Sequence, residues 1–345
     1  MTVLFSLLGA ALILFTLFDV FKTVFMIGGG AGPQSGFLAD RAWRRALRFH
    51  DPERERSHSR MRSAGPLIVL MILMVWTFEL VLGWALVFPA TAFEEPDSHV
   101  FADRLLFATT AVVGRAGNTP PLAVDGDGWE ILHSLAGLTG VFILSVGIAY
   151  VLPILGAVAH KRSVAAKIHT LGDSVADMLA LGRTSGGSSF ELHLVALVGE
   201  IGLTAERHRA YPVLHYFHSH DRHAALAPAV AKIALLLQED LEDVDKVDPT
   251  VRIPLERAIA NLLGAVSAMG LSRYARDVPD LDDSAMDGIE LDPSSPGGAH
   301  DGAIPTRWLE AYVRFDGWQW STVAPPVYTG EIDAAAERTS VTARG

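Results

Sequence analysis

The sequence predicts an all-α integral membrane protein, with three transmembrane helices plus a re-entrant pore helix, followed by a cytoplasmic α-helical domain. Three long apolar stretches, nearly free of charge, lie before residue 160, and each exceeds the roughly 20 helical residues that cross a hydrocarbon core. After residue 160 the apolar residues recur at helical spacing, without strand alternation. Only 19% of the 345 residues are charged, against about 25% in soluble chains.

Composition excludes several function classes. The absence of cysteine rules out disulfides, thiolate metal sites and a thiol nucleophile. A net charge of −11 argues against a nucleic-acid partner, because such binding requires basic surface. No nucleotide-binding, hydrolase or kinase motif occurs, so the sequence predicts that the protein is not an enzyme.

The first apolar stretch predicts an N-terminal transmembrane helix within residues 1–30. A secretory signal peptide is the alternative, but the stretch lacks a basic start and an A-x-A-like cleavage site. Asp19 and Lys22 share one helix face and are intramembrane charges. An interfacial pair with Lys22 reaching the headgroups is the favoured interpretation, and a functional site is the alternative.

Charge in the loops predicts the orientation. Residues 31–64 are expected to form a basic cytoplasmic linker, since 40–62 alone hold eight arginines against four acids. The connection 91–131 carries seven acids and only Arg104 and Arg115. Because basic loops stay inside, we expect insertion in the plasma or inner membrane with the N-terminus outside and the C-terminal domain cytoplasmic.

Residues 65–160 have the layout of a pore module. Apolar stretches 66–90 and 131–159 flank residues 101–113, which are apolar but too short to span, and a Gly- and Pro-rich segment follows at 114–121. This order predicts an outer helix, a short pore helix, an irregular filter and an inner helix. A surface-lying helix with an ordinary loop is the alternative. Glu79 is the single charge of the outer helix, placed to pair with a neighbouring module or to lie behind the filter.

The module resembles the pore of the potassium-channel superfamily. The resemblance is carried by Ala108-Thr109-Thr110, Val113-Gly114, Gly117-Asn118 and Pro120. It implies a homotetramer in the lipid bilayer, permeated by a monovalent ion. It implies a selectivity filter within Thr109, Thr110, Ala111, Val112, Val113, Gly114, Arg115, Ala116, Gly117 and Asn118, and a gating hinge at Gly140, Gly147 and Pro153.

The filter departs from the family pattern. Arg115-Ala116 stands between the glycines where the family has one aromatic residue, so the spacing is one residue longer. A fourfold ring of Arg115 suits anions or repels cations, which puts potassium selectivity in question. A second register takes residues 110–114 as the filter and places Arg115 at its outer mouth.

Residues 161–275 predict the cytoplasmic helical domain, which would gate the pore. Its first apolar repeat has coiled-coil-like spacing suited to oligomerisation, and comprises Val164, Ile168, Leu171, Val175 and Met178. An acidic linker is expected at 276–303, an aromatic-rich docking segment at 304–330 and a disordered tail at 331–345.

Five of the 13 histidines fall between His208 and His223. The candidate ligands for a transition metal are His215, His218, His220 and His223, because imidazole suits such ions. A proton sensor is a second hypothesis, and a connecting segment with solvated histidines is the third and favoured one. No cofactor follows with certainty.

The sequence thus predicts a pore-loop ion channel. The alternative is a non-conducting membrane-anchored sensor or scaffold that retains the pore-module architecture.

Overall fold

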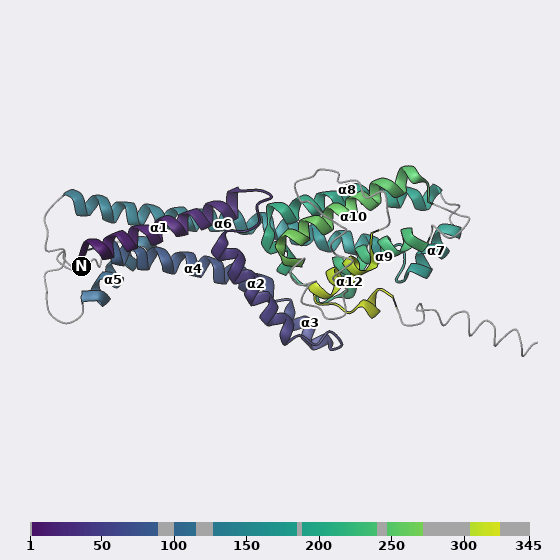
Figure 1. Cartoon of the computed structure of the whole chain (residues 1–345), viewed down its shortest axis with the longest axis horizontal. Coiled ribbons are helices and arrows are strands. Elements are labelled where there is room, and N and C mark those ends of the chain that lie inside the picture. The colour runs from purple at the N-terminus through teal and green to yellow at the C-terminus, as the bar shows by residue number, and fades with distance from the viewer. Residues whose placement is uncertain are drawn as a thin grey trace, which may run out of the picture. The chain divides into compact units, whose positions relative to one another are not determined.

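The computed structural model describes residues 2–88, 100–114, 127–184, 188–239, 247–271 and 304–324, and the regular elements among them are all helical. Two compact units make up the chain, Met1–Arg41 with Pro66–Leu155 (unit 1) and Ala42–Gly65 with Gly156–Gly345 (unit 2). The division falls within helices α2 (Pro33–Arg48), α4 (Ala64–Val87) and α6 (Asp127–His169). Figure 1 labels these three helices.

Three segments are long and apolar enough to cross a membrane, namely Val3–Phe25, Glu55–Val87 and Ile131–His169. They coincide with the three predicted spans, so the all-helical membrane class is confirmed. The orientation in the membrane stays a prediction.

In unit 1, α1 (Thr2–Phe25) packs antiparallel to α4 (Ala64–Val87). Ser6 Oγ donates to Val87 O at 3.3 Å near one end, and Trp76 Nε1 donates to Asp19 Oδ2 at 2.9 Å towards the other. Between these bonds, a Cβ added to Gly9 would lie 2.4 Å from Gly83 O. Small residues therefore let the two backbones approach closely, as is common between membrane helices.

Helix α6 packs against α4 in the same unit. Trp84 Nε1 donates to Thr139 Oγ1 at 3.0 Å, and a Cβ on Gly147 would lie 3.2 Å from Leu73 Cδ2. Pro153 lies inside α6, which continues as one helix past it. Gly147, expected as a hinge, is thus also a packing contact.

The regular elements that the structure describes in unit 2 are helices, and the unit includes residues 42–65 besides the range 161–275 expected to form a helical domain. Besides its parts of α2 and α6 it contains α3 (Glu55–Met61), α7 (Val175–Thr184), α8 (Ser188–Ala210), η2 (Pro212–Tyr216), η3 (Arg222–Ala224), α9 (Leu226–Glu239), α10 (Pro249–Val266), the π-helical turn η4 (Ser267–Leu271), α12 (Thr306–Phe315) and η6 (Trp320–Thr322). Residues 31–64, expected as a linker, therefore hold helices α2 and α3.

The core of unit 2 comes from the predicted helical faces. On α9, Leu226, Val230, Ile233 and Leu237 are at most 1% exposed. The repeat expected to join subunits is also buried within the single chain, with Val164, Ile168 and Met178 at 0%. That seam is therefore core rather than a free oligomerisation surface.

The aromatic segment docks on its own unit as far as the structure describes it. Trp43 Nε1 donates to Phe315 O at 3.1 Å, and the His215 ring stacks on Phe315 at 4.1 Å. The expected acidic linker, residues 325–330 of the docking segment and the tail lie outside the described residues.

Candidate functional site

Helix α5 (Val100–Val113) begins beside the carboxyl end of α4. Arg104 donates from Nε to Phe88 O at 2.5 Å and from Nη2 to Leu86 O at 3.3 Å. These are the carbonyls that a helix leaves without partners at its end. The Phe107 ring meets Phe88 edge to face at 4.8 Å. The first half of α5 is thereby held at the end of a membrane-spanning helix.

The other end of α5 packs deep along α6. A Cβ added to Gly140 would lie 1.8 Å from Val112 O, and one on Gly137 would lie 3.4 Å from Ala111 O. Gly140 is nine residues beyond Ile131, where the apolar stretch begins, which is about 14 Å of helix. The backbone contact at this depth requires glycine at position 140.

Helix α5 has 14 residues, or about 21 Å, which is less than a hydrocarbon core of about 30 Å. It ends at Gly114, whose φ of 75° is a left-handed conformation that glycine adopts readily. The helix thus runs from one end of α4 to a point part-way along the apolar length of α6.

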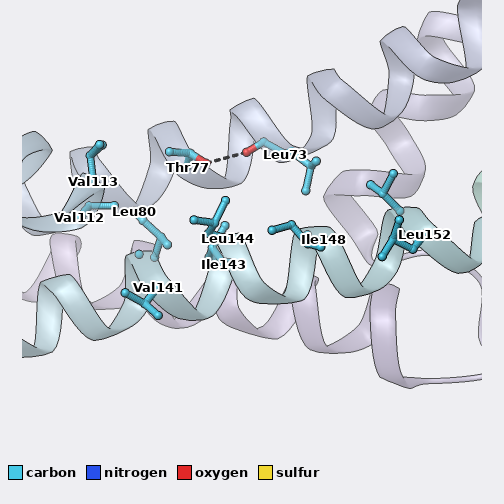
Figure 2. Close-up of a pocket in the computed structure, with 13 residues that line it drawn as sticks. Leu73, Thr77, Leu80, Val112, Val113, Val141, Ile143, Leu144, Ile148 and Leu152 are labelled. Carbon is cyan, nitrogen blue, oxygen red and sulfur yellow. Dashed lines mark hydrogen bonds between the residues drawn. The ribbon is translucent and has the colours of Figure 1, made fainter.

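An apolar groove of about 510 Å³ lies beyond the carboxyl end of α5. Figure 2 shows Val112 and Val113 at one end and the side chains of α4 and α6 along its length. Thr77 contributes a hydroxyl, but that group donates to Leu73 O at 2.9 Å (Figure 2). The described groove therefore offers methyl and methylene groups rather than polar ones.

The first five residues of the predicted filter are helical. Thr109 and Thr110 donate their hydroxyl protons to Leu105 O at 2.7 Å and Phe107 O at 2.8 Å within α5. The register that took residues 110–114 as an extended filter is therefore wrong, because 110–113 lie in α5. Arg115, Ala116, Gly117 and Asn118 lie outside the described residues.

Asp19 is fully buried and caps α2, in place of the expected pair with Lys22. Its carboxylate accepts from the backbone N–H of Gln34 at 2.9 Å, from Ser35 and from Trp76 Nε1. A carboxylate at a helix N-terminus receives the free amides of the first turn and is favoured by the helix dipole. A Cβ on Gly32 would lie 2.2 Å from Asp19 Oδ1, so the turn before α2 needs glycine there.

Glu79 also has partners inside unit 1. Thr16 Oγ1 donates to its Oε2 at 2.9 Å, and Gln34 Nε2 donates to its Oε1. The side chains of Asp19 and Glu79 are thus connected through Gln34 of α2. These contacts within the chain take the place of the expected pairing with a neighbouring module.

The four candidate metal ligands do not form one group. His215 is fully buried against Phe315, while His218 meets His50 and His58, and His223 meets His169 and Asp173. His220 belongs to neither of these groups. Sequence reasoning missed His50 and His58, because they lie in the basic segment and no short spacing relates them to His218.

Comparison with known proteins relates the chain to a membrane protein. The chain is 28% identical over 243 residues to "Uncharacterized membrane protein YdjJ" of Bacillus subtilis (strain 168), covering 66% of this chain and 68% of that protein. No protein-family model and no solved structure matches the chain. The similarity supports membrane integration and assigns no activity.

Proposed function

We propose that the chain is one subunit of a homotetrameric pore-loop channel for monovalent cations, gated by the helical domain of unit 2. The observation that carries the proposal is that the short helix α5 ends part-way along the apolar length of α6. Val112 O, near the end of α5, packs against Gly140 there. A helix that enters a membrane and stops inside it leaves its last carbonyls in need of partners. An ion or water in a pore supplies them.

The direction of α5 favours a cation. Its carboxyl end carries partial negative charge from the aligned peptide dipoles, and a low-dielectric surrounding strengthens that field. An extended filter begins no earlier than Gly114, since α5 extends to Val113. The proposal does not extend to potassium over sodium, because Arg115-Ala116 lengthens the family spacing.

The proposal includes the orientation of the chain in the membrane. With the basic segment inside, α5 enters from the outer face, and α6 leads into the cytoplasm and unit 2. The apolar groove between α4 and α6 then meets a neighbouring subunit.

Flux through liposomes containing the purified full-length chain tests the proposal. We expect K⁺ and Na⁺ flux above that of empty liposomes, and little Cl⁻ flux. Gly140→Ala places a methyl group where Val112 O lies, and overpacking of this kind typically costs about 1–3 kcal/mol. Cation flux through Gly140→Ala should therefore fall below that of the wild type, because α5 can no longer lie at its wild-type position on α6.

Gly156→Ala is the matched control, because nothing lies within 4 Å of a Cβ at Gly156 in the same helix. It should conduct as the wild type does. Absence of flux of all three ions, together with a monomeric or dimeric particle, would reject the channel in favour of a membrane-anchored sensor or scaffold. Equal flux through the two alanine variants would reject the role given to α5.

A further inference from the structure

Three imidazoles from distant parts of the sequence meet inside unit 2. His50 follows α2, His58 lies in α3 and His218 follows η2. One ring nitrogen of each lies within 4.8 Å of those of the other two. His58 and His218 are 5% and 4% exposed, and the shortest separation joins His58 Nδ1 to His218 Nε2 at 2.9 Å.

Backbone carbonyls determine which nitrogen of each ring carries hydrogen. His58 Nε2 lies 3.0 Å from Pro52 O, and His218 Nδ1 lies 2.8 Å from Asp316 O. A carbonyl oxygen only accepts, so both nitrogens are N–H donors. A neutral imidazole has one N–H, which leaves His58 Nδ1 and His218 Nε2 as lone pairs.

His50 follows the same pattern. Its Nε2 lies 2.8 Å from Gly317 O and is the donor, which leaves Nδ1 as the lone pair. Ser57 Oγ donates to that nitrogen at 2.8 Å and also accepts from Asp51 N at 2.9 Å. A metal ion bound at Nδ1 displaces the Ser57 hydroxyl group, because both occupy the direction of the ring lone pair.

The closest two nitrogens are His58 Nδ1 and His218 Nε2, and their lone pairs therefore face each other. At 2.9 Å they repel, unless a proton or a metal cation lies between them. A metal cation is a species that both lone pairs accept.

We propose that His50, His58 and His218 bind one divalent transition-metal ion of the Zn²⁺, Co²⁺ or Ni²⁺ type. Neutral imidazole nitrogens suit these ions. The chain has no cysteine, so no thiolate ligand is present that would favour a softer metal ion. Zn–N bonds of about 2.0–2.1 Å in tetrahedral geometry separate the nitrogens by about 3.3 Å. The closest pair must therefore move apart by about 0.4 Å, and the two rings, whose planes are 13° apart, must turn so that both lone pairs point at the ion.

The surroundings resemble those of metal-binding histidines in general. Each ring donates its second nitrogen to a carbonyl, which fixes its tautomer and orientation. The Trp318 ring stacks on His58 at 4.2 Å and forms an apolar wall. Trp318 and His50 also line a cavity of about 450 Å³, which gives an ion an entry path and leaves room for water as a fourth ligand.

A buried ion pair holds the segments that carry this arrangement. Lys161 Nζ lies 3.3 Å from Asp316 Oδ1 and donates to Phe217 O, also at 3.3 Å. Lys161 thus anchors both the residue before His218 and the residue whose carbonyl binds it. The Asp316 carboxylate offsets the ammonium charge beside the proposed cation.

The second group of His169, Asp173 and His223 provides an internal comparison. Asp173 and His223 are exposed, and Asp173 also pairs with Arg222 at 3.5 Å. Because two of its three members are exposed, this group serves as the control for adventitious binding.

The test uses full-length protein in detergent, stripped with a chelator, and the metals alone as probes. Calorimetry with Zn²⁺ should show one tight site per chain, and Co²⁺ should give the visible absorption of a tetrahedral nitrogen site. His58→Gln should weaken Zn²⁺ binding by more than the 10- to 100-fold typical of losing an outer-shell partner. His223→Gln and the exposed His193→Gln should leave binding unchanged.

A second measurement distinguishes loss of the metal site from misfolding of the variants. Zn²⁺ should raise the apparent melting temperature of the wild type and of His223→Gln, but not of His58→Gln or His50→Gln. No binding of Zn²⁺, Co²⁺ or Ni²⁺ to the wild type overturns the proposal. Loss of binding in His223→Gln with retention in His58→Gln also overturns it and assigns the metal to the exposed group. Ion flux is not measured in these experiments, so their outcome tests the metal site independently of the proposed channel.

Discussion

Buried histidines make unit 2 sensitive to acid. His208 is 0% exposed, its Nδ1 bonds to Thr204 O at 2.8 Å, and burial lowers its pKa to about 3. The imidazolium therefore forms far more easily in the unfolded chain, where the pKa is near 6.5. Between these two values the unfolded state binds the extra proton, so folding stability rises with pH.

We expect acid destabilisation of the metal-free protein as the pH falls from 6.5 towards 3. Each such histidine contributes a slope of about 1.4 kcal/mol per pH unit, and its stabilisation is fully present above pH 6.5. His208→Gln keeps a donor for Thr204 O but does not titrate, so its stability should depend less steeply on pH. Denaturant unfolding of the full-length protein at pH 7.5, 6 and 5, with chelator present, measures the slopes. His193→Gln, at an exposed position, should match the wild type, and identical slopes for His208→Gln and wild type would contradict the assignment.

At the scale of single helices, the start of α2 is stabilised by one residue of α1, Asp19. Asp19 receives the first-turn amides of α2 and also the indole N–H of Trp76, so it joins α1, α2 and α4. Removing the carboxylate leaves a helix start uncapped and a buried indole without its partner.

Asp19→Ala should destabilise the protein by roughly 2–4 kcal/mol, combining the loss of the cap with the unpaired indole. Lys22→Ala is the control one turn away, and it should change stability by less than about 0.5 kcal/mol. Apparent melting temperature measures the first effect, and the rate of trypsin cleavage after Arg41, Arg44 or Arg45 measures the fraying of α2. Equal behaviour of the two variants would show that α2 holds its position without Asp19.

Helix identity was more predictable from the sequence than the contacts between helices. The three apolar stretches coincide with long apolar helices, because burial in lipid needs only length and composition. Periodicity placed Asp19 and Lys22 on one face correctly, yet it carries no information on the turn that brings α2 back to Asp19. The spacing of His215 and His218 suggested a shared ion, but the neighbours of His218 lie 160 residues away in the sequence at His58. A local sequence pattern predicts a helix, whereas a contact such as that between His58 and His218 depends on how distant segments pack.

At the scale of the whole molecule, the chain leaves an apolar groove open on its membrane-spanning part. Leu144 lines that groove and is 67% exposed, and its neighbours along α6, Val141, Ile148 and Leu152, are also more than half exposed. Such a face meets either lipid or a second copy of the chain. The tetramer proposed above requires a second copy at this face.

The absence of native cysteine allows a direct test of that requirement, since a single introduced thiol is the sole reactive one. Leu144→Cys should cross-link into covalent dimers in native membranes with a short bifunctional thiol reagent. Leu14→Cys on α1, also 67% exposed, is the matched control and should remain largely monomeric because α1 lies outside the pore module. Native mass spectrometry of the unlinked particle should give four copies of the 37.1 kDa chain. Equal cross-linking at the two positions, or a monomeric particle, would contradict the assembly, because the α6 groove would then face lipid.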